Sequence, residues 1–531
     1  MNPTLRTNNK IVRICSAIAV GLAGLLFIFL SVASILETCR IDQANPYAEI
    51  VNFDKDLVLT NLALIILTIL GALFFLRKNI KLSTVSTRFI VLVMLMVTTI
   101  ISLAWINLVQ SKSSGDAMIL LNTARDAANN QYNSFHSSYN YYGNYSYYLY
   151  YPFQLGYVLF AEILYRIFGT ASTDILFQVP NVIALDCIYV GIVMLTKRLF
   201  DRKSVTNLTA IFLTVCFQPM FMTTFTYGIL LGLAFSVWSA YHVVRFMQTD
   251  KWTHGLAAVA LISVSVLLKY NNMIMMAAIV IALLMHAVDK LELKRSLIAV
   301  GLAVLMVLCP IGLQKSVIAS YAGRSGAVLN TQVSQTLYAY MGISDCNMAP
   351  GWYNGVAMET LRDNNMDVKK ANEIASEGIK NRLEYLSKNN LLFEFEKKKL
   401  LSQLNEPAFE SIWLSQVREH NLAQGEQLSP IVTSVYSGGL AKVLDNWFNY
   451  YNMIVYIAFA AGMIFLIRRK KLKPWMIILP VAVLGGVLYH MLFEGKSQYL
   501  LPYFLLLIPF AVYGLIEGAK AINKKIDRLY R

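Results

Sequence analysis

The sequence predicts an all-α polytopic membrane protein with about 12 transmembrane helices and a small helical cap outside the membrane. Of its 531 residues, 56% are hydrophobic and only 15% are charged, whereas soluble domains carry roughly a quarter charged residues. Lys and Arg gather in short flanks at 77–88, 468–471 and 520–528, where the positive-inside rule expects them. The net charge of +15 therefore indicates membrane topology, and no nucleic-acid partner is expected.

The predicted spans are apolar stretches close to the ~20 residues that a membrane helix needs. They lie at about 12–36, 57–76, 89–109, 175–196, 205–222, 227–245, 254–270, 272–288, 297–313, 448–467, 474–492 and 499–516. The first is longer than the apolar core of a cleaved signal and is interpreted as an anchor.

Charge decides the status of one further apolar stretch, 153–168. If this stretch crossed the membrane, the basic clusters at 197–203 and 290–295 would face outward, against the positive-inside rule. We therefore predict that 153–168 is a juxtamembrane or re-entrant helix on the outer side, shielded by protein. Both termini are then cytoplasmic in a multi-pass protein of the cell membrane.

These spans divide the chain into four parts. Residues 1–88 hold two N-terminal transmembrane helices, and 89–313 form a core with an outer loop at 110–152 and the juxtamembrane helix 153–168. Residues 314–447 form an extracytoplasmic helical cap, because the segment is far too long for a simple connection. Residues 448–531 hold three C-terminal transmembrane helices and a basic cytoplasmic tail.

Within the cap, the spacing of apolar residues predicts helices at 367–386 and 390–404. The run Lys397, Lys398 and Lys399 is interpreted as a solvated face. Glu406, which precedes a proline, is interpreted as part of a helix boundary.

The outer loop carries an acid followed by a tyrosine-rich segment. Nine of the twenty residues from Tyr132 to Tyr151 are tyrosine, a residue enriched at the membrane–water boundary. We expect this segment to lie along the membrane surface, with Asp116 over it. Asp116 has two interpretations: the start of the helix that follows, or a general base that takes a proton from an acceptor hydroxyl.

Other polar residues in outer turns are candidate binding residues. Each has a plain alternative: Asp126 and Arg125 as solvated neighbours of Asp116, Lys269 as a lysine reaching the interface, and the rest as polar turn residues. The candidates are Arg125, Asp126, Tyr227, Lys269, Asn271, Glu494, Lys496, Gln498 and Tyr499.

The sequence contains no motif of a nucleotide- or metal-dependent soluble enzyme. Of its six histidines, only His136 and His420 fall in outer segments, and neither has partners at metal-ligand spacing. We therefore expect no cofactor and no metal site, and leave a divalent cation open. Cys39 and Cys346 both fall outside the predicted spans, and whether they pair is also left open.

An ordered set of short motifs resembles a known family. The set is an early outer loop with an acid, Tyr151-Pro152-Phe153-Gln154-Leu155-Gly156, an apolar helix ending Phe168-Gly169, Lys269-Tyr270-Asn271-Asn272, and Glu494 followed by Gln498-Tyr499-Leu500-Leu501-Pro502. Over residues 89–516 this order resembles GT-C glycosyltransferases of the protein mannosyltransferase and aminoarabinose transferase type. It is most similar to versions from Gram-positive bacteria, which carry two extra N-terminal spans.

The resemblance implies a sugar donor on a polyprenyl phosphate and an acceptor at the cell envelope: a surface polymer, a lipid or a protein. By position, Asp116 matches the catalytic acid of the first outer loop, and the transfer is expected to be inverting. The sequence departs from the family pattern at two positions. No acid follows Tyr227, which weakens the case for a bound divalent cation. Gln498 stands where relatives often have Arg, so Lys496, Lys269 or Arg324 is expected to contact the phosphate.

A transporter or flippase is the main alternative, because 12 spans with both termini inside also describe many transporters. Transporters more often show an internal repeat and broken mid-membrane helices. The sequence shows no repeat, and its clearest mid-span charge is Asp186. A non-catalytic assembly scaffold is a further alternative.

Overall fold

The computed structural model describes residues 9–42, 49–78, 82–136, 145–289, 292–329, 331–416, 428–468 and 472–529. Within these ranges the regular secondary structure is helical apart from one two-stranded hairpin. Ten of the described helices are long and apolar enough to cross a membrane. The predicted all-α polytopic fold is therefore confirmed.

The long apolar helices fall where the sequence predicts them. They are α1 (Lys10–Leu36), α2 (Val58–Arg77), α3 (Thr87–Val109), α7 (Ile175–Phe200), α10 (Ile229–Thr249), α12 (Met273–Asp289), α13 (Leu293–Ser325), α20 (Gly439–Arg468), α21 (Ile478–Leu492) and α22 (Leu501–Leu529). In the bundle, α10 packs on α7 and α11, while α20 packs on α1 and α22.

Two predicted spans look different in the structure. The stretch 205–222 is a bent pair, α8 (Lys203–Thr214) and then α9 (Gln218–Phe221) with the turn η4 (Met222–Thr224), at 48° to one another. The break precedes Pro219, which has no N–H to continue the helix of the preceding turn. The stretch 254–270 is α11 (Trp252–Leu268), a helix of 17 residues that ends at the polar residue Lys269.

The apolar stretch behind the tyrosine-rich segment forms η3 (Pro152–Gln154) and α6 (Leu155–Phe168). The 14 residues of α6 span about 21 Å, less than the ~30 Å hydrocarbon core of a bilayer. It packs on α4 (Gly115–Ala128), α11 and α13. Its length is that of a helix that does not cross a membrane.

The segment predicted as a cap consists of short helices. They are α14 (Gln335–Ile343), α15 (Val356–Asp363), α16 (Val368–Lys388), α17 (Leu392–Leu404), α18 (Trp413–Gln416) and α19 (Pro430–Ser437). The two helices expected at 367–386 and 390–404 are α16 and α17. Asp367 begins α16 by accepting the backbone N–H groups of Lys369 and Lys370, as an N-cap acid does.

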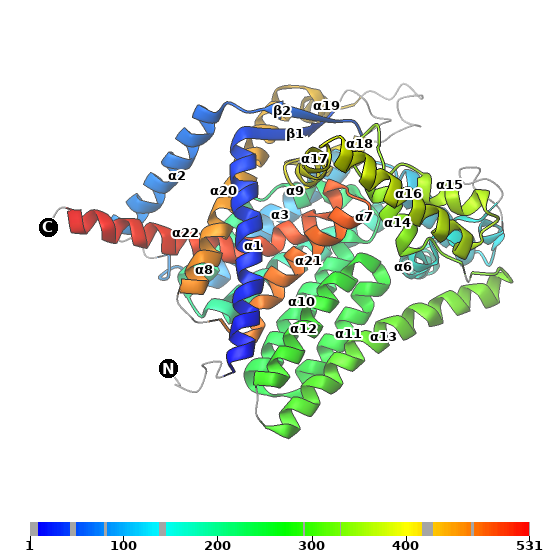
Figure 1. Cartoon of the computed structure of the whole chain (residues 1–531), viewed down its shortest axis with the longest axis horizontal. Helices are drawn as coiled ribbons and strands as arrows, with labels where there is room; N and C mark the ends of the chain where they lie inside the picture. The colour runs from blue at the N-terminus through cyan, green and yellow to red at the C-terminus, as the bar shows by residue number, and fades with distance from the viewer. Residues whose placement is uncertain are drawn as a thin grey trace.

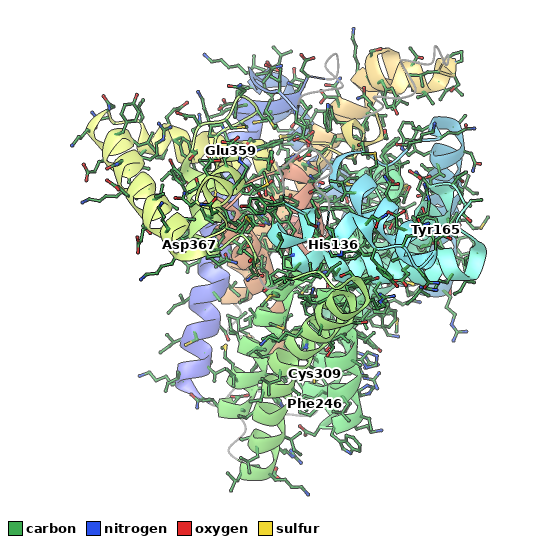
Figure 2. The ribbon with its side chains drawn as sticks, turned by 90° about the vertical axis from the view of Figure 1, so that its right-hand side faces the viewer. His136, Tyr165, Phe246, Cys309, Glu359 and Asp367 are labelled. Carbon is green, nitrogen blue, oxygen red and sulfur yellow. The ribbon has the colours of Figure 1, made fainter. Side chains whose placement is uncertain are left out.

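A hairpin joins the first two helices and lies beside the cap. Strands β1 (Glu37–Ile41) and β2 (Val51–Lys55) pair antiparallel, with Cys39 opposite Phe53. Figure 1 shows this hairpin next to α17 and α18, at the end of α1 away from the N-terminus. In Figure 2, Glu359 and Asp367 of the cap lie in the same half of the molecule as His136 and Tyr165, and Phe246 and Cys309 lie in the other half.

The tyrosine-rich segment is partly core rather than surface. Tyr147 and Tyr150, the first and last residues of the short helix α5 (Tyr147–Tyr150), are fully buried, as is Tyr148. Residues 137–144 and His420 lie outside the described residues. The prediction that this segment lies along the membrane surface is therefore wrong for these three rings, because the cap and α13 enclose them. Cys39 and Cys346 are free thiols.

Candidate functional site

Asp116 lies in the first turn of α4. Ser114 is the residue that precedes the helix as its N-cap, so Asp116 does not fill that position itself. A carboxylate in the first helical turn is stabilised by the helix dipole. The Tyr227 hydroxyl donates to Asp116 Oδ2 over 2.9 Å, while the Asp116 side chain keeps partial access to solvent.

The surroundings act on the pKa of Asp116 in opposite directions. Burial raises it, and this effect is the largest. Hydrogen bonds from Tyr227 and Tyr147 and the positive charges of Lys269 and Lys496 act the other way, because they favour the ionised carboxylate. A raised pKa brings a carboxylate closer to the range in which it accepts a proton efficiently near neutral pH.

Tyr227 is fixed on both sides. Its hydroxyl accepts a hydrogen bond from Gln154 Nε2 at 2.5 Å while it donates to Asp116. The residue after it, Gly228, has φ +78°, and a Cβ there would lie 2.5 Å from the Leu268 carbonyl oxygen. Only glycine fits this turn without displacing the end of α11. Burial and the nearby Asp116 raise the pKa of Tyr227, so its hydroxyl stays protonated.

Lys269 follows α11 directly, and its side chain lies against Tyr227. Its Nζ lies 3.5 Å from the Tyr227 ring centroid and 5.8 Å from that of Tyr499. Burial lowers its pKa to about 7, and Asp116 and Glu494 partly oppose this shift. Within the described ranges no carboxylate forms a salt bridge with Lys269, so its charge is held by aromatic faces and distant acids.

The turn between α21 and α22, residues 493–499, supplies the remaining polar groups. The Tyr499 hydroxyl donates to Glu494 Oε1 at 3.4 Å, and burial raises the pKa of Glu494 to about 7. Lys496 forms a buried salt bridge with Glu49 from the hairpin. We call Asp116, Tyr227, Lys269, Glu494 and Tyr499 the Asp116 centre.

Two glutamates beneath the α21–α22 turn were not predicted as site residues. Ser497 Oγ lies 2.8 Å from Glu406 Oε2 and 3.0 Å from Glu410 Oε1. A serine hydroxyl has one proton to donate, so Ser497 satisfies one of the two carboxyl groups at a time. Burial raises the pKa of Glu406 to about 7 and that of Glu410 to about 8.

The interpretation of the lysine run as a solvated face is wrong for Lys399. This residue of α17 is fully buried, and its ammonium donates to the carbonyl oxygens of Gly342, Met491 and Phe493 at 2.5, 2.8 and 2.8 Å. It thereby caps the C-terminal end of α21 and ties the α21–α22 turn to the cap. Lys397 pairs with Glu37, and Lys398 remains half-exposed.

Other predicted residues lie apart from this centre. Asp126 is ten residues from Asp116 along α4, or about 15 Å, and Arg125 donates to the Tyr165 hydroxyl at 3.2 Å. Asn271 lies in the turn η5 (Tyr270–Asn272), between the end of α11 and the start of α12. The Gln498 backbone N–H donates to Glu410 at 3.1 Å.

Arg324, one of three candidates for the phosphate, is already engaged. Its guanidinium donates to both oxygens of Glu162, at 2.7 and 3.0 Å. Such two-pronged pairs are strong and specific. Tyr321 donates to the same carboxylate, so this cluster joins α13 to α6 rather than facing Asp116.

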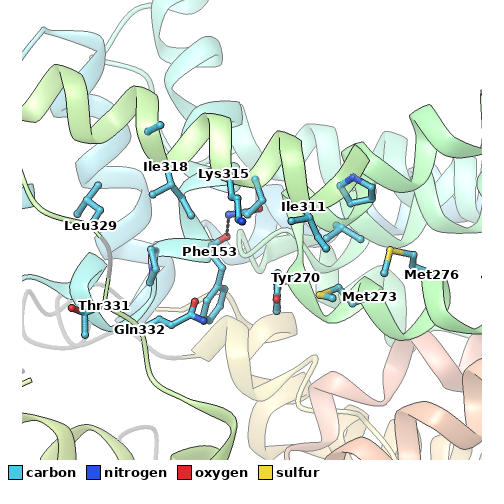
Figure 3. A pocket seen from close by; sticks show the side chains of 15 residues that line it. Phe153, Tyr270, Met273, Met276, Ile311, Lys315, Ile318, Leu329, Thr331 and Gln332 are labelled. Atoms are coloured by element: carbon cyan, nitrogen blue, oxygen red, sulfur yellow. Dashed lines mark hydrogen bonds between the residues drawn. The ribbon is translucent and has the colours of Figure 1, made fainter. Parts of the chain in front are cut away.

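An apolar cavity of about 510 Å³ adjoins the centre (Figure 3). Its walls come from η3, α11, η5, α12 and α13, and they include Phe153, Tyr270, Met273, Met276, Ile311 and Ile318. Gln314 and Lys315 add polar groups on α13, and Gln314 Nε2 donates to the Phe153 carbonyl oxygen at 3.0 Å.

The cavity and the Asp116 centre share one wall. The rings of Phe153 and Tyr270, 5.2 Å apart, line the cavity. Their direct neighbours in the sequence, Gln154 and Lys269, contact Tyr227 on the other side. A Cβ on Gly156 would lie 1.9 Å from the Leu267 carbonyl oxygen, so this close approach of α6 to α11 requires glycine.

The described part of the chain contains no group of three or more His, Cys, Asp or Glu placed to hold a metal ion. The carboxylates near Asp116 instead hydrogen-bond to tyrosine, serine, lysine and backbone N–H groups. Whether a divalent cation takes part in the reaction stays a prediction.

The ten long apolar helices of the described residues indicate a multi-pass membrane protein, and the comparison with protein families indicates a glycosyltransferase. The model of the dolichyl-phosphate-mannose-protein mannosyltransferase family matches residues 155–313, the stretch that contains α6, the Tyr227 turn and Lys269. This match confirms the resemblance of the chain to GT-C glycosyltransferases. The matched stretch does not include Asp116 or the α21–α22 turn. No curated protein matches the sequence.

Proposed function

We propose that this protein transfers a sugar from a polyprenyl-phosphate carrier to an acceptor hydroxyl, with inversion, and that Asp116 is the general base. The observation that carries this proposal is the shared wall. On one side lie a carboxylate and an ammonium group, Asp116 and Lys269, and on the other lies an apolar cavity. A polyprenyl-phosphate sugar has the matching chemistry, with a polar, anionic head on an apolar tail.

The proposed reaction uses the groups in place. Asp116 accepts the proton of the acceptor hydroxyl as the acceptor oxygen attacks the anomeric carbon. The bond between that carbon and the phosphate oxygen breaks, and its electron pair leaves with the carrier phosphate. Attack opposite the leaving group inverts the anomeric carbon. Tyr227 orients Asp116 and stabilises its ionised form through the 2.9 Å hydrogen bond.

Lys269 is the best-placed cation for the phosphate among the three considered. Arg324 is held by Glu162 and Lys496 by Glu49, so their charges are already neutralised. Lys269 has no such partner, and its ammonium adjoins both the cavity wall and Asp116. A cation at the leaving phosphate stabilises the negative charge that develops there. Lys315 supplies a further cation at the cavity.

The acceptor is proposed to enter beneath the cap, on the extracytoplasmic side of the cell membrane. The turn 493–499 and the cap lie close to Asp116 and are fastened to one another by Lys399. Partial enclosure of this kind restricts the access of water, which would otherwise compete with the acceptor. A cell-envelope polymer, a lipid or a protein fits this arrangement.

Transfer by purified protein in proteoliposomes tests the proposal. Polyprenyl-phosphate sugars with a radiolabelled sugar serve as donors, and envelope fractions of a deletion strain serve as acceptors. Asp116→Asn is expected to lower turnover roughly 10³-fold, while Asp126→Asn, on the same helix, keeps it near wild type. Wild-type turnover in Asp116→Asn would refute the role of the base.

A deletion strain separates transfer from transport. Loss of one sugar decoration from the surface glycans is the expected result. Unchanged glycans, with the sugar substrate accumulating in the cytoplasm, would instead identify a transporter.

A further inference from the structure

We propose that Glu49 is a positioning residue of the transferase site, acting through Lys496 to fix the α21–α22 turn. The two N-terminal helices and their hairpin are then part of the catalytic unit and not an appended anchor. This role of Glu49 rests on the proposed function, because it assumes that the site catalyses sugar transfer. Glu49 lies outside the family-matched stretch 155–313 and outside every motif of the sequence.

The contact itself is buried and direct. Lys496 Nζ donates to Glu49 Oε2, and the two side chains are 12% and 10% exposed. Nζ also lies 5.8 Å from the ring centroid of Trp352, which is itself fully buried. A charge buried to this degree is destabilising unless a partner neutralises it, and Glu49 is the only described residue in ion-pair contact with Lys496.

The hairpin has backbone contacts with the cap that do not involve Lys496. The backbone N–H of Val51, two residues on, donates to the Met348 carbonyl oxygen at 3.2 Å. On the other strand, the Cys39 N–H donates to the Asn405 carbonyl oxygen at 2.9 Å. The hairpin is therefore fastened to the cap by its backbone, and it presents Glu49 as a fixed anchor for a lysine side chain that would otherwise be mobile.

Lys496 stands between the acids of several elements. Glu49 faces it from the hairpin, Glu410 from the loop before α18, and Glu494 from its own turn. Beyond these, Lys496 acts on the pKa of Asp116 in α4. Glu406 reaches the same turn through Ser497. Lys496 thus connects the hairpin electrostatically to the carboxylates of the Asp116 centre.

Removing the charge of Glu49 should shift the pKa values of the neighbouring acids in a defined direction. Glu49 raises the pKa of both Glu494 and Glu410. In Glu49→Gln both values fall, and Lys496, released from its partner, turns toward Glu494 and makes the potential at Asp116 more positive. The ionised form of Asp116 is then favoured, so its pKa falls as well.

The test uses the purified full-length protein in detergent and a double-mutant cycle of Glu49→Gln and Lys496→Met. Each single variant is expected to lower Tm by roughly 3–6 °C, and the double variant by clearly less than the sum, since no buried charge is left unpaired. Asp54→Asn, on the same hairpin but half-exposed and paired with Arg40, is the matched control.

The pH profiles of stability and of kcat/KM distinguish a positioning role of Glu49 from simple stabilisation of the fold. Because the pKa of Glu494 (about 7) and of Glu410 (about 8) lie above the usual carboxyl value, stability falls as pH rises from about 5 to 8. This fall is expected to flatten in Glu49→Gln and not in Asp54→Asn. In transfer assays, the acid limb of kcat/KM is expected to move to lower pH by roughly half a unit to one unit.

Additive Tm losses would overturn the proposal. So would coupled losses with both pH profiles unchanged relative to Asp54→Asn, because the pair would then be structural only. If the wild-type protein transfers no sugar while the coupling and the flattened profile persist, the proposed function fails and the link between Glu49 and Lys496 stands.

Discussion

The Tyr227 hydroxyl donates a hydrogen bond to Asp116 Oδ2 across 2.9 Å, joining residues 111 positions apart in the sequence. The bond connects the start of α4 to the turn before α10. Lys269 Nζ lies over the ring of the same tyrosine, so one tyrosine orders both charged groups of the proposed reaction.

Tyr227→Phe is expected to raise the pKa of Asp116, because it removes a hydrogen bond that favours the ionised carboxylate. A general base is inactive when protonated. Activity is lost as pH falls through the pKa of Asp116, so the acid limb of kcat/KM moves to higher pH. Tyr165→Phe, which removes a hydroxyl that contacts Arg125, is the control. An unmoved acid limb in active Tyr227→Phe would contradict this role.

Lys269 is expected to determine the alkaline limb of the pH profile of kcat/KM. Its pKa of about 7 means that the free protein loses this charge as pH rises through neutrality, and binding of an anionic head weakens with it. Lys269→Arg keeps its charge at every relevant pH and should extend kcat/KM to higher pH. Lys269→Met should lower kcat/KM roughly 10²-fold at pH 6.

The same alkaline limb in wild type and Lys269→Arg would assign that limb to another group. Measurement of kcat/KM from pH 5 to 9 with a single polyprenyl-phosphate sugar decides between these outcomes.

The cavity should bind the carrier tail. Ala319 lines it from α13, and Ala319→Trp places a large ring where the tail would lie. The expected result is a KM about tenfold higher for a long-chain polyprenyl donor and little change for a donor with a two-isoprene tail. Ser320→Trp, on the next residue but not in the cavity lining, serves as control. Equal effects on both donors would exclude this cavity as the tail site.

Lys399 should hold the cap to the α21–α22 turn. Lys399→Met leaves three carbonyl oxygens without their donor, at a cost of about 3 kcal/mol. A lower Tm and faster proteolysis of the cap are expected. Lys398→Met, beside it and half-exposed, should match wild type. A Tm equal to that of Lys398→Met would show that the cap is fastened by other contacts.

The sequence was sufficient to predict the helices and some of the residues that the structure places together in the candidate site. Asp116, Lys269 and Glu494 stand out because each is a charge next to a long apolar stretch, where ionisable groups are rare. Glu49, Glu410 and Lys399 do not stand out, since they lie in polar segments where a charge is usually solvated. Their burial depends on how the hairpin, the cap and the last turn pack together.

A similar limit applies to the tyrosines and to Asp126. Composition identifies an amphipathic ring, but it does not distinguish a membrane boundary from a protein core. Tyr147 and Tyr150 belong to the core. The ten-residue spacing of Asp126 from Asp116 places it on a similar face of the helix, yet the rise of α4 separates the two by about 15 Å.

The length of helix α13 bears on where the cavity lies relative to the membrane. Its 33 residues reach about 50 Å, well beyond a hydrocarbon layer of about 30 Å. Gln314 and Lys315, two of the polar residues that line the cavity, lie about 32 Å along it from Leu293, level with the far boundary of such a layer. One continuous helix would thus set the depth at which the protein contacts a lipid headgroup, independently of the length of the lipid tail.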